Sequence, residues 1–514
     1  MMKKVKLTMI LTGIALLTSC AKQKESAPVI TNPVVADEVT IFPKPTPAKS
    51  STETGYVGWI GDVMPYYFNN QFEIFFLHDA TDQVKQLSKG QHPIHRFTTK
   101  DFLKFNYEGE AIAYSTADQQ DQLIGTGSIV KHNQLYYCYY TGHNGSVNWI
   151  SSNPREAVMY ATSTDLKTWT KKNTFKLVAP IGYSSFDFRD PSVFYNEEFK
   201  EYWMMVSTQK SNKAVILVFT TKDLASDNWA IRGTLPIDND NYLMMECAEI
   251  FKSGSKYYLL FAENWSATPG TRYRVANSTE GPWTMPVAGN DMFDGHQFYA
   301  GRSVSNGTQI YTMGWAHRRN PETNTGTLTW GGNLVTHELY TLSNGNLAVK
   351  LPASVLNYFN SETDAVVKNK SGNAVHTGTD FMFNGTGSIM RFNALNKTTM
   401  IKGSIKLAEL NGSLIFGLNA KDDNTGSYTI KIEPQKNRIA GYNNNLEITR
   451  VSFKFTANTV YNFKLVMEKS VAILYINDEV ALTNRVYNLN NNLWTISAEG
   501  INATVRNIKI ATHK

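Results

Sequence analysis

Cysteine is scarce in this chain, with three among 514 residues, at positions 20, 138 and 247. Three cysteines so far apart supply neither a disulfide framework nor the close spacing of a zinc site. The histidines at 143, 296 and 317 lack ligand spacing too, and we interpret them as structural. We therefore predict no disulfide framework, no metal site and no cofactor.

Clustered positive charge is also missing. The formal net charge is +6, and Lys3, Lys4 and Lys6 supply half of it in a segment, residues 1–19, that contains no acid. No basic run occurs in the rest of the chain. Nucleic-acid binding requires a basic patch or stripe, so this class of function is excluded.

No apolar run is long enough to remain in a membrane. The longest, residues 7–17, follows the basic start and precedes Leu17-Thr18-Ser19-Cys20, which is the order of a secretory signal. These four residues resemble a bacterial lipobox, so we predict a lipoprotein signal peptide at 1–20 with lipid attachment at Cys20. The alternative is an ordinary signal peptide with a chance cysteine. The prediction implies export to the bacterial cell envelope and a membrane contact through the lipid.

Proline, threonine and serine then recur through residues 21–54, which we interpret as a flexible tether. Beyond it the chain is rich in aromatic residues and glycine and has no long amphipathic helical stretch. Such a composition favours an all-β fold.

A repeated unit runs through residues 55–355. An apolar strand, a polar turn and an aromatic-rich strand recur five times, beginning near residues 65, 127, 191, 248 and 301. A Thr/Ser-x-Asp-Leu element followed by tryptophan or phenylalanine comes after several of them, which completes the content of a four-stranded blade. The pattern predicts a five-bladed β-propeller. From 361 to 514 short alternating strands with Asn- and Gly-rich turns predict a β-sandwich domain.

Three acidic positions stand just before or at the start of repeated strands: Asp62, Asp190 and Glu246. Because the first residues of the inner strands of a propeller converge on one end of its channel, we expect these carboxylates to share a site. Glycosidic cleavage uses a pair of carboxyl groups, one as proton donor and one opposing it. The three acids therefore predict a glycoside hydrolase, although the residues alone do not assign their roles.

The chain resembles glycoside hydrolase family 32, the enzymes that cleave fructans and sucrose, in the same motif order from about residue 56 to 513. The motif Trp-x-Asn-Asp-Pro-Asn-Gly corresponds to residues 59–65 (WIGDVMP), Arg-Asp-Pro to residues 189–191 and Glu-Cys to residues 246–247. Shorter segments that also resemble family motifs are residues 126–128, 298–300 and 330–334. The resemblance implies a propeller followed by a sandwich and hydrolysis of β-fructosidic bonds by a retaining double displacement. It implies Asp62 as nucleophile, Asp190 as transition-state stabiliser and Glu246 as general acid and base.

The first motif departs from the family pattern. Gly61 stands in place of the first asparagine, and Val63-Met64-Pro65 replaces Pro-Asn-Gly, so hydrogen bonds from those asparagines to the substrate are absent. Two alternatives stay open. One is a pentofuranosidase of a related propeller family, acting on arabinan or xylan types of glycan. The other is a glycan-binding lipoprotein that has lost catalysis.

Further residues are candidates for contact with the oligo- or polysaccharide substrate. We predict substrate binding by Trp59, Ser128, Arg189 and Trp315, since aromatic planes stack on the apolar faces of sugars and arginine donates hydrogen bonds. Secondary candidates, which start or end strands near the expected mouth or offer an indole there, are Asp79, Trp149, Glu263, Trp265 and Asp294.

Overall fold

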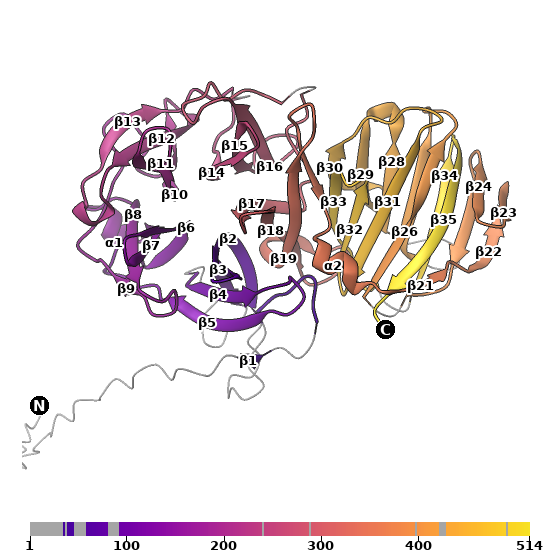
Figure 1. Ribbon diagram of the computed structural model, residues 1–514, viewed down its shortest axis with the longest axis horizontal. Coiled ribbons are helices and arrows are strands. Elements are labelled where there is room, and N and C mark those ends of the chain that lie inside the picture. Colours follow the sequence, from indigo (N-terminus) through magenta and orange to yellow (C-terminus); the bar gives the residue numbers. More distant parts are fainter. Residues whose placement is uncertain are drawn as a thin grey trace, which may run out of the picture.

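The computed structural model describes residues 34–35, 39–45, 58–80, 92–238, 241–286, 289–395, 398–420, 428–489 and 492–514. The predicted signal peptide, Cys20 and most of the predicted tether lie outside these residues. Within them the protein is almost entirely β, with a propeller followed by a sandwich, as the sequence predicts (Figure 1). No helix among the described residues combines the length and the apolar character needed to cross a bilayer.

The strands of residues 58–350 form three separate antiparallel sheets and part of one nine-stranded sheet, whose two halves are joined by the pairing of Gly332 with Ile60. Divided at that pairing, these strands make five consecutive units. The first holds β2 (Gly58–Phe68), β3 (Gln71–Ala80), β4 (Ile94–Thr99) and β5 (Asn106–Ile112), with β1 (Val34–Val35) paired to β5. The second holds β6 (Leu123–His132), β7 (Leu135–His143), β8 (Glu156–Ser163) and β9 (Thr170–Lys171), with the short helix α1 (Val147–Ile150) between β7 and β8. The third holds β10 (Phe188–Asn196), β11 (Glu201–Lys210), β12 (Lys213–Thr221) and β13 (Ala230–Thr234), with η1 (Leu224–Ser226) before β13.

The fourth unit holds β14 (Glu246–Ser253), β15 (Lys256–Glu263) and β16 (Gly270–Ala276), and the fifth holds β17 (Phe298–Ser305), β18 (Ile310–Asn320), β19 (Thr327–Thr341) and β20 (Leu347–Lys350). The inner strands β2, β6, β10, β14 and β17 each contact the next, and β17 contacts β2. The five units therefore surround a common centre (Figure 1).

The expectation of four strands in every unit is wrong for the fourth. Among its described residues only β14, β15 and β16 form a sheet, and an isolated bridge joins Val275 to Thr284 where a fourth strand was expected. Pro282 and Pro286 flank this bridge. Proline has no N–H to donate, so a regular outer ladder cannot extend through this segment.

Two sheets that share one apolar core make the sandwich. The larger contains β21 (Ser361–Asp364), β23 (Ala374–Thr377), β24 (Asp380–Asn384), β26 (Thr399–Leu407), β31 (Val460–Glu468), β32 (Val471–Ile476), β33 (Val480–Arg485) and β35 (Asn502–Thr512). The smaller contains β22 (Val367–Ser371), β25 (Ser388–Phe392), β27 (Ser413–Ala420), β28 (Tyr428–Glu433), β29 (Arg438–Asn443), β30 (Leu446–Ser452) and β34 (Leu493–Glu499). Helix α2 (Ala353–Tyr358) leads from β20 to β21, and η3 (Pro434–Lys436) follows β28.

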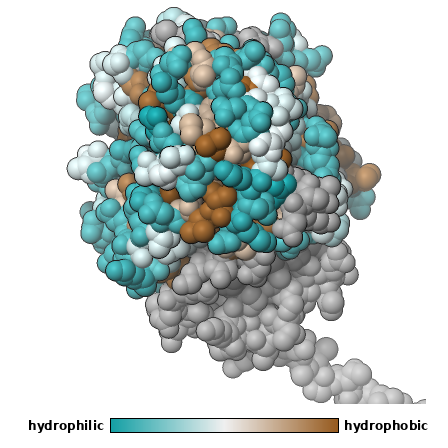
Figure 2. Space-filling model, turned by 90° about the vertical axis from the view of Figure 1, so that its right-hand side faces the viewer, coloured by the Kyte–Doolittle hydropathy of each residue, from teal (hydrophilic) through white to brown (hydrophobic). Residues whose placement is uncertain are grey.

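The side of the molecule drawn in Figure 2 is mainly hydrophilic and carries a few small apolar patches. Exposed apolar side chains of this size are normal on a folded domain.

Part of the predicted tether is packed instead of free. Ile41 and Phe42 are buried in an apolar core to which both the propeller and the sandwich contribute residues. Both carboxylate oxygens of Glu468, on sandwich strand β31, accept the N–H of Ile41 at 3.0 and 3.1 Å, and one accepts the N–H of Phe42 at 2.9 Å. An apolar pair within a polar, proline-rich stretch finds a better environment against the domains than in water. Residues 39–45 therefore pack against both the propeller and the sandwich.

Candidate active site

The inner strand of every propeller unit shifts its register at the same point. The shifts fall between Gly61 and Met64, Gly125 and Gly127, Arg189 and Ser192, Glu246 and Glu249, and Tyr299 and Arg302. The first residues within these five shifts are, in order, Asp62, Thr126, Asp190, Cys247 and Ala300. The backbone φ angles of Asp190, Cys247 and Ala300 are 59°, 53° and 53°. A bulge bends a strand and re-aims the side chains beside it. Asp62 and Asp190 thus lie inside two of these five shifts, and Glu246 borders a third.

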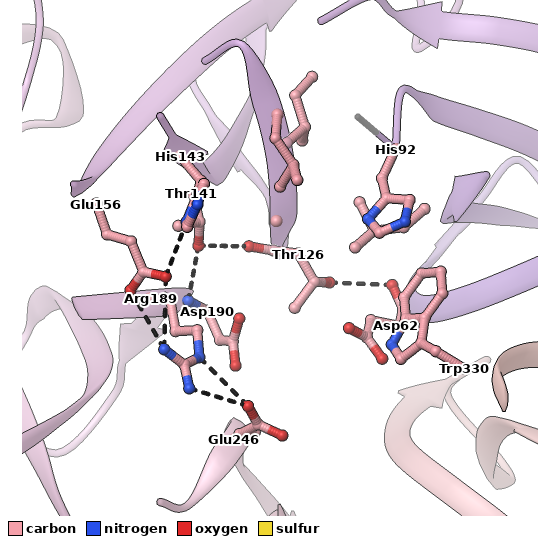
Figure 3. A pocket seen from close by; sticks show the side chains of 14 residues that line it. Asp62, His92, Thr126, Thr141, His143, Glu156, Arg189, Asp190, Glu246 and Trp330 are labelled. Carbon is pink, nitrogen blue, oxygen red and sulfur yellow. Dashed lines mark hydrogen bonds and ion pairs between the residues drawn. The ribbon is translucent and has the colours of Figure 1, made fainter. Parts of the chain in front are cut away.

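A cavity of about 180 Å³ lies beside these bulges (Figure 3). Asp62 from β2, Asp190 from β10 and Glu246 from β14 line it together with Arg189. The structure therefore brings the three predicted acids and the predicted arginine to one place. In a regular strand Arg189 and Asp190 would point to opposite faces, and the bulge between Arg189 and Ser192 lets both reach the cavity.

Glu246 is held by donors on both oxygens. Arg189 Nε and Nη2 lie 3.3 and 3.2 Å from Oε1, and the Tyr299 hydroxyl donates to Oε2 at 2.8 Å. Such bonds fix the direction of the carboxyl group. Glu246 thus has one orientation in the cavity before any substrate arrives.

Arg189 is itself fixed by further carboxylates. Its Nη1 lies 2.7 Å from Asp187 Oδ1 and 3.3 Å from Glu156 Oε2, and Glu156 also accepts the Phe188 N–H at 2.7 Å. The opposite oxygen of Glu156 lies 3.2 Å from His143 Nδ1. Burial opposes ionisation of Arg189, but the charges of Glu156 and Glu246 prevail and raise its pKa above the ordinary value. The guanidinium therefore stays charged and pre-positioned beside Glu246.

Asp190 is buried at the base of the cavity. Its N–H donates to Thr141 Oγ1 at 2.8 Å, and the Cys247 N–H donates to its Oδ2 at 2.9 Å. Burial, and then the charge of Glu246, raise the pKa of Asp190 to about 7, against the opposing charge of Arg189. Carboxylates confined together repel one another, which disfavours ionisation of Asp190.

Asp62 faces the same cavity from the first unit. The Trp315 indole N–H donates to its Oδ1 at 3.1 Å, and Thr126 Oγ1 donates to its backbone carbonyl at 3.0 Å. Burial and the charge of Glu246 raise the pKa of Asp62 to about 6, while the Trp315 hydrogen bond and the charge of Arg302 lower it. Oδ1 is thus engaged, and Oδ2 is the oxygen left for chemistry.

Three of the predicted substrate contacts do not line the cavity. Trp59 is buried, with the Lys44 ammonium 3.8 Å from its ring centroid. The Ser128 hydroxyl donates to the Pro191 carbonyl at 3.0 Å and so joins the second unit to the third. Trp315 is fully buried and acts on Asp62 instead of on a sugar face.

The secondary candidates lie elsewhere as well. Asp79 pairs with Arg318 at 2.7 Å, Glu263 pairs with Arg272 at 3.1 Å, and Asp294 accepts the Thr483 N–H of the sandwich at 2.7 Å. These carboxylates serve buried networks in place of the expected sugar hydroxyls. Trp149 and Trp265 do not line the cavity either.

Several lining residues were not predicted as site residues. They are Leu77, His92, Leu123, Ile124, Gly125, Thr126, Thr141, His143, Glu156 and Trp330. Thr126 and Trp330 lie in short segments that resemble family motifs, and this resemblance could have identified them as site residues. His143 and Glu156 lie in no such segment. Among the described residues no group of three or more His, Cys, Asp or Glu side chains could hold a metal ion.

Comparison with known protein families identifies the family to which the chain belongs. A family model described as the glycosyl hydrolases family 32 N-terminal domain matches residues 54–349, and one described as "GH32, BT1760-like, C-terminal domain" matches residues 345–510. The chain belongs to glycosyl hydrolase family 32. The family resemblance inferred from the acidic motifs is therefore confirmed.

Curated relatives cover only part of this family 32 chain. The sucrose-6-phosphate hydrolase of Escherichia coli is 27% identical over 276 residues, which is 50% of this chain and 54% of the relative. The raffinose invertase of Escherichia coli is 26% identical over 299 residues, 54% of this chain and 59% of the relative. The matches thus span little more than half the length of these relatives.

Solved structures share the fold across nearly the whole chain. The sucrose-6-phosphate hydrolase of Lactobacillus gasseri has a TM-score of 0.70 at 18% identity and covers 89% of this chain and 91% of its own. The exo-inulinase of Aspergillus awamori has a TM-score of 0.67 at 15% identity, over 88% of this chain and 95% of its own. The propeller-plus-sandwich architecture is therefore that of known family 32 members.

Proposed function

We propose that this protein is a glycoside hydrolase that cleaves β-fructosidic bonds in fructan or sucrose-type saccharides by a retaining double displacement. The observation that carries the proposal is the meeting of Asp62, Asp190 and Glu246, from three propeller units, in one cavity. Family membership supports it, because the Escherichia coli relatives are named as hydrolases of sucrose phosphate and raffinose.

The roles follow from the contacts of each acid. Asp62 Oδ2 attacks the anomeric carbon and forms a glycosyl-enzyme, while Trp315 holds Oδ1. Glu246 gives its proton to the departing oxygen, then takes a proton from the water that releases the sugar. Asp190, fixed by the Cys247 and Thr141 contacts, accepts hydrogen bonds from the sugar hydroxyls as positive charge develops.

The first step needs a proton, and the close packing of the carboxyl groups keeps one in the cavity. With the pKa of Asp190 near 7 and that of Asp62 near 6, the acids retain a proton at mildly acidic pH. Asp62 and Asp190 share this proton, because neighbouring carboxyl groups titrate together. The reaction requires it on Glu246 when the leaving oxygen arrives.

The test is sugar release by the chain from Ala21 onward, which keeps residues 39–45. Wild type, Asp62→Asn and Glu246→Gln are incubated with levan, inulin, sucrose and arabinan. We expect fructose from at least one fructan or from sucrose, with kcat reduced roughly 10³-fold or more in both variants. Asp380→Asn, on the sandwich, is the control and should keep full activity.

Gly61 favours a second candidate, a pentofuranosidase, because the asparagine of the family motif is absent. Pentose release from arabinan without fructose release would replace the first proposal with this one. Sugar binding that survives in Glu246→Gln, with no release by wild type, would instead identify a glycan-binding protein.

We also propose that Cys20 carries a lipid that attaches the protein to a membrane of the cell envelope. The order of basic start, apolar run and Leu-Thr-Ser-Cys supports this. In a bacterial host, the protein should fractionate with membranes, and Cys20→Ser should abolish incorporation of labelled palmitate. Incorporation that persists in Cys20→Ser would disprove attachment at this residue.

A further inference from the structure

Trp330 of β19 lies directly against Gly61 of β2. A Cβ atom at residue 61 would collide with Cη2 and Cζ2 of the Trp330 ring. Gly61 is not among the glycines with positive φ, so its backbone would accept other residues. Space, and not conformation, therefore demands glycine here, because an indole from another unit occupies the place that a side chain at residue 61 would need.

The indole is held in place by other rings. His92 stacks on it with centroids 4.4 Å apart and an interplanar angle of 20°, and Trp315 tilts against it at 5.6 Å and 60°. Burial lowers the pKa of His92 to about 4, so the stacked imidazole is neutral at ordinary pH. Trp330 is only half-buried and lines the cavity beside Asp62 (Figure 3).

The cavity consequently has two chemically different sides. Trp330 and His92 lie on the side of Asp62 (Figure 3), and Trp330 packs against the apolar cluster that contains the lining residues Leu77 and Ile124. In Figure 3, Glu156, His143 and Arg189 lie across the cavity from Trp330 and offer charged and polar groups. A ligand that satisfies both sides needs an apolar face and a hydroxyl-bearing edge.

We propose that Trp330, given room by Gly61, is the specificity-determining residue of this cavity. A furanosyl unit stacks its C–H face on the indole and turns its hydroxyls toward Arg189, Glu156 and His143. The ring thereby replaces the polar recognition that the asparagine of the family motif would supply. This inference rests on the proposed glycosidase function but not on fructose as the sugar.

The experiment compares kcat and KM of the full chain with those of Trp330→Phe and Trp330→Ala. The substrates are levan, inulin, sucrose and p-nitrophenyl α-L-arabinofuranoside. Loss of a stacking contact in Trp330→Ala should raise KM about tenfold on the cleaved substrate while kcat changes less than about threefold. Trp330→Phe should lie between this variant and wild type. Trp265→Ala, whose indole is exposed outside the cavity, is the matched control and should leave KM unchanged.

Gly61→Asn tests the shared space independently. It should raise KM like Trp330→Ala, because the amide displaces the indole, and the double variant Gly61→Asn/Trp330→Ala should lose no more than either single variant. If Gly61→Asn does not fold, the double variant, which restores the room, should fold. Additive losses in the double variant would overturn the inference.

The outcomes separate this inference from the proposed function. Cleavage of the arabinofuranoside alone, with the KM effect at Trp330, ends the fructoside proposal and keeps the role of Trp330. A fall in kcat at constant KM would make Trp330 a support for Trp315 and overturn the specificity role. If no substrate is cleaved, calorimetric titration with levan decides: tenfold weaker binding in Trp330→Ala supports the inference, and unchanged or absent binding overturns it.

Discussion

The hydrogen bond from Trp315 to Asp62 ties the pH dependence of the reaction to one indole. As the proposed nucleophile, Asp62 must be ionised to attack, so activity should rise as the pH passes through its pKa of about 6. Phenylalanine at 315 cannot donate, and the pKa of Asp62 should increase. We expect the acidic limb of kcat/KM in Trp315→Phe to move upward by about one pH unit, the equivalent of one hydrogen bond to a charged group.

The measurement is kcat/KM between pH 4.5 and 8. Trp149→Phe is the matched control, since the Trp149 N–H donates to the Pro154 carbonyl outside the cavity. An acidic limb that stays in place in Trp315→Phe would show that another group sets it.

Asp190 makes the folded protein less stable as the pH rises. Its pKa of about 7 exceeds the ordinary 3.8, so between about pH 4 and 7 the folded chain binds a proton that the unfolded chain releases. Stability is therefore lost across this interval. Asp190→Asn should be more stable than wild type at pH 8, on the order of 2–4 kcal/mol, and equal to it near pH 4.

Thermal unfolding at both pH values checks this prediction. The variant should also lose activity, because the acid is proposed to contact the sugar. Asp380→Asn, which removes an exposed partner of Arg506, should show no gain that depends on pH. A stability gain of equal size at pH 4 and pH 8 would contradict the charge argument.

At the scale of single residues, the sequence predicted the acids but not the groups that tune them. Asp62, Asp190 and Glu246 precede recognisable strands, so convergence of inner strands was enough to group them. Glu156 approaches the cavity from β8, the third strand of its unit, and its role depends on Arg189 being turned by a bulge. Such a contact depends on side-chain direction, which strand periodicity alone does not give.

At the scale of elements, hydrophobic alternation predicted the propeller units and the change to a sandwich near residue 361. It could not predict the register shifts, because one extra residue in a strand leaves the pattern of apolar positions almost unchanged. It also overestimated the fourth unit, where prolines interrupt the outer ladder. The aromatic and apolar residues determined the strands, while their detailed pairing depended on local backbone conformation.

The packing of residues 39–45 depends on one carboxylate. Glu468→Ala removes the acceptor for the N–H groups of Ile41 and Phe42 and for the Thr40 hydroxyl, 2.9 Å away. We expect roughly 2 kcal/mol of lost stability, since bonds to a charged acceptor are replaced by bonds to water. Hydrogen exchange at Ile41 and Phe42 should accelerate strongly.

Glu362→Ala is the control for this segment, because Glu362 pairs with Lys402 on the exposed edge of the sandwich. It should leave both amides protected. Unchanged exchange at Ile41 and Phe42 in Glu468→Ala would mean that apolar burial alone holds the segment.

At the scale of the whole molecule, the sandwich contacts strand β18, whose Trp315 bonds the proposed nucleophile Asp62. Arg485 of β33 donates from Nε to the His317 carbonyl at 2.9 Å and from Nη2 to the Ala316 carbonyl at 2.8 Å. Both carbonyls follow Trp315 on β18, whose indole bonds Asp62. Burial lowers the pKa of Arg485 to about 10, which still leaves it charged at neutral pH. Residues 315–317 thus contact both Arg485 of the sandwich and Asp62 of the cavity.

Arg485→Met should therefore affect catalysis from the other domain. Two buried carbonyls lose their donors, which costs about 2–4 kcal/mol of stability. If the loss relaxes the Trp315 segment, the acidic limb of kcat/KM moves upward as in Trp315→Phe, and the double variant shows no further shift. Arg506→Met, an exposed arginine of the same domain, is the control and should change neither quantity. A normal pH profile in a destabilised Arg485→Met would limit the sandwich to a structural role, because stability would then be lost without any change at Asp62.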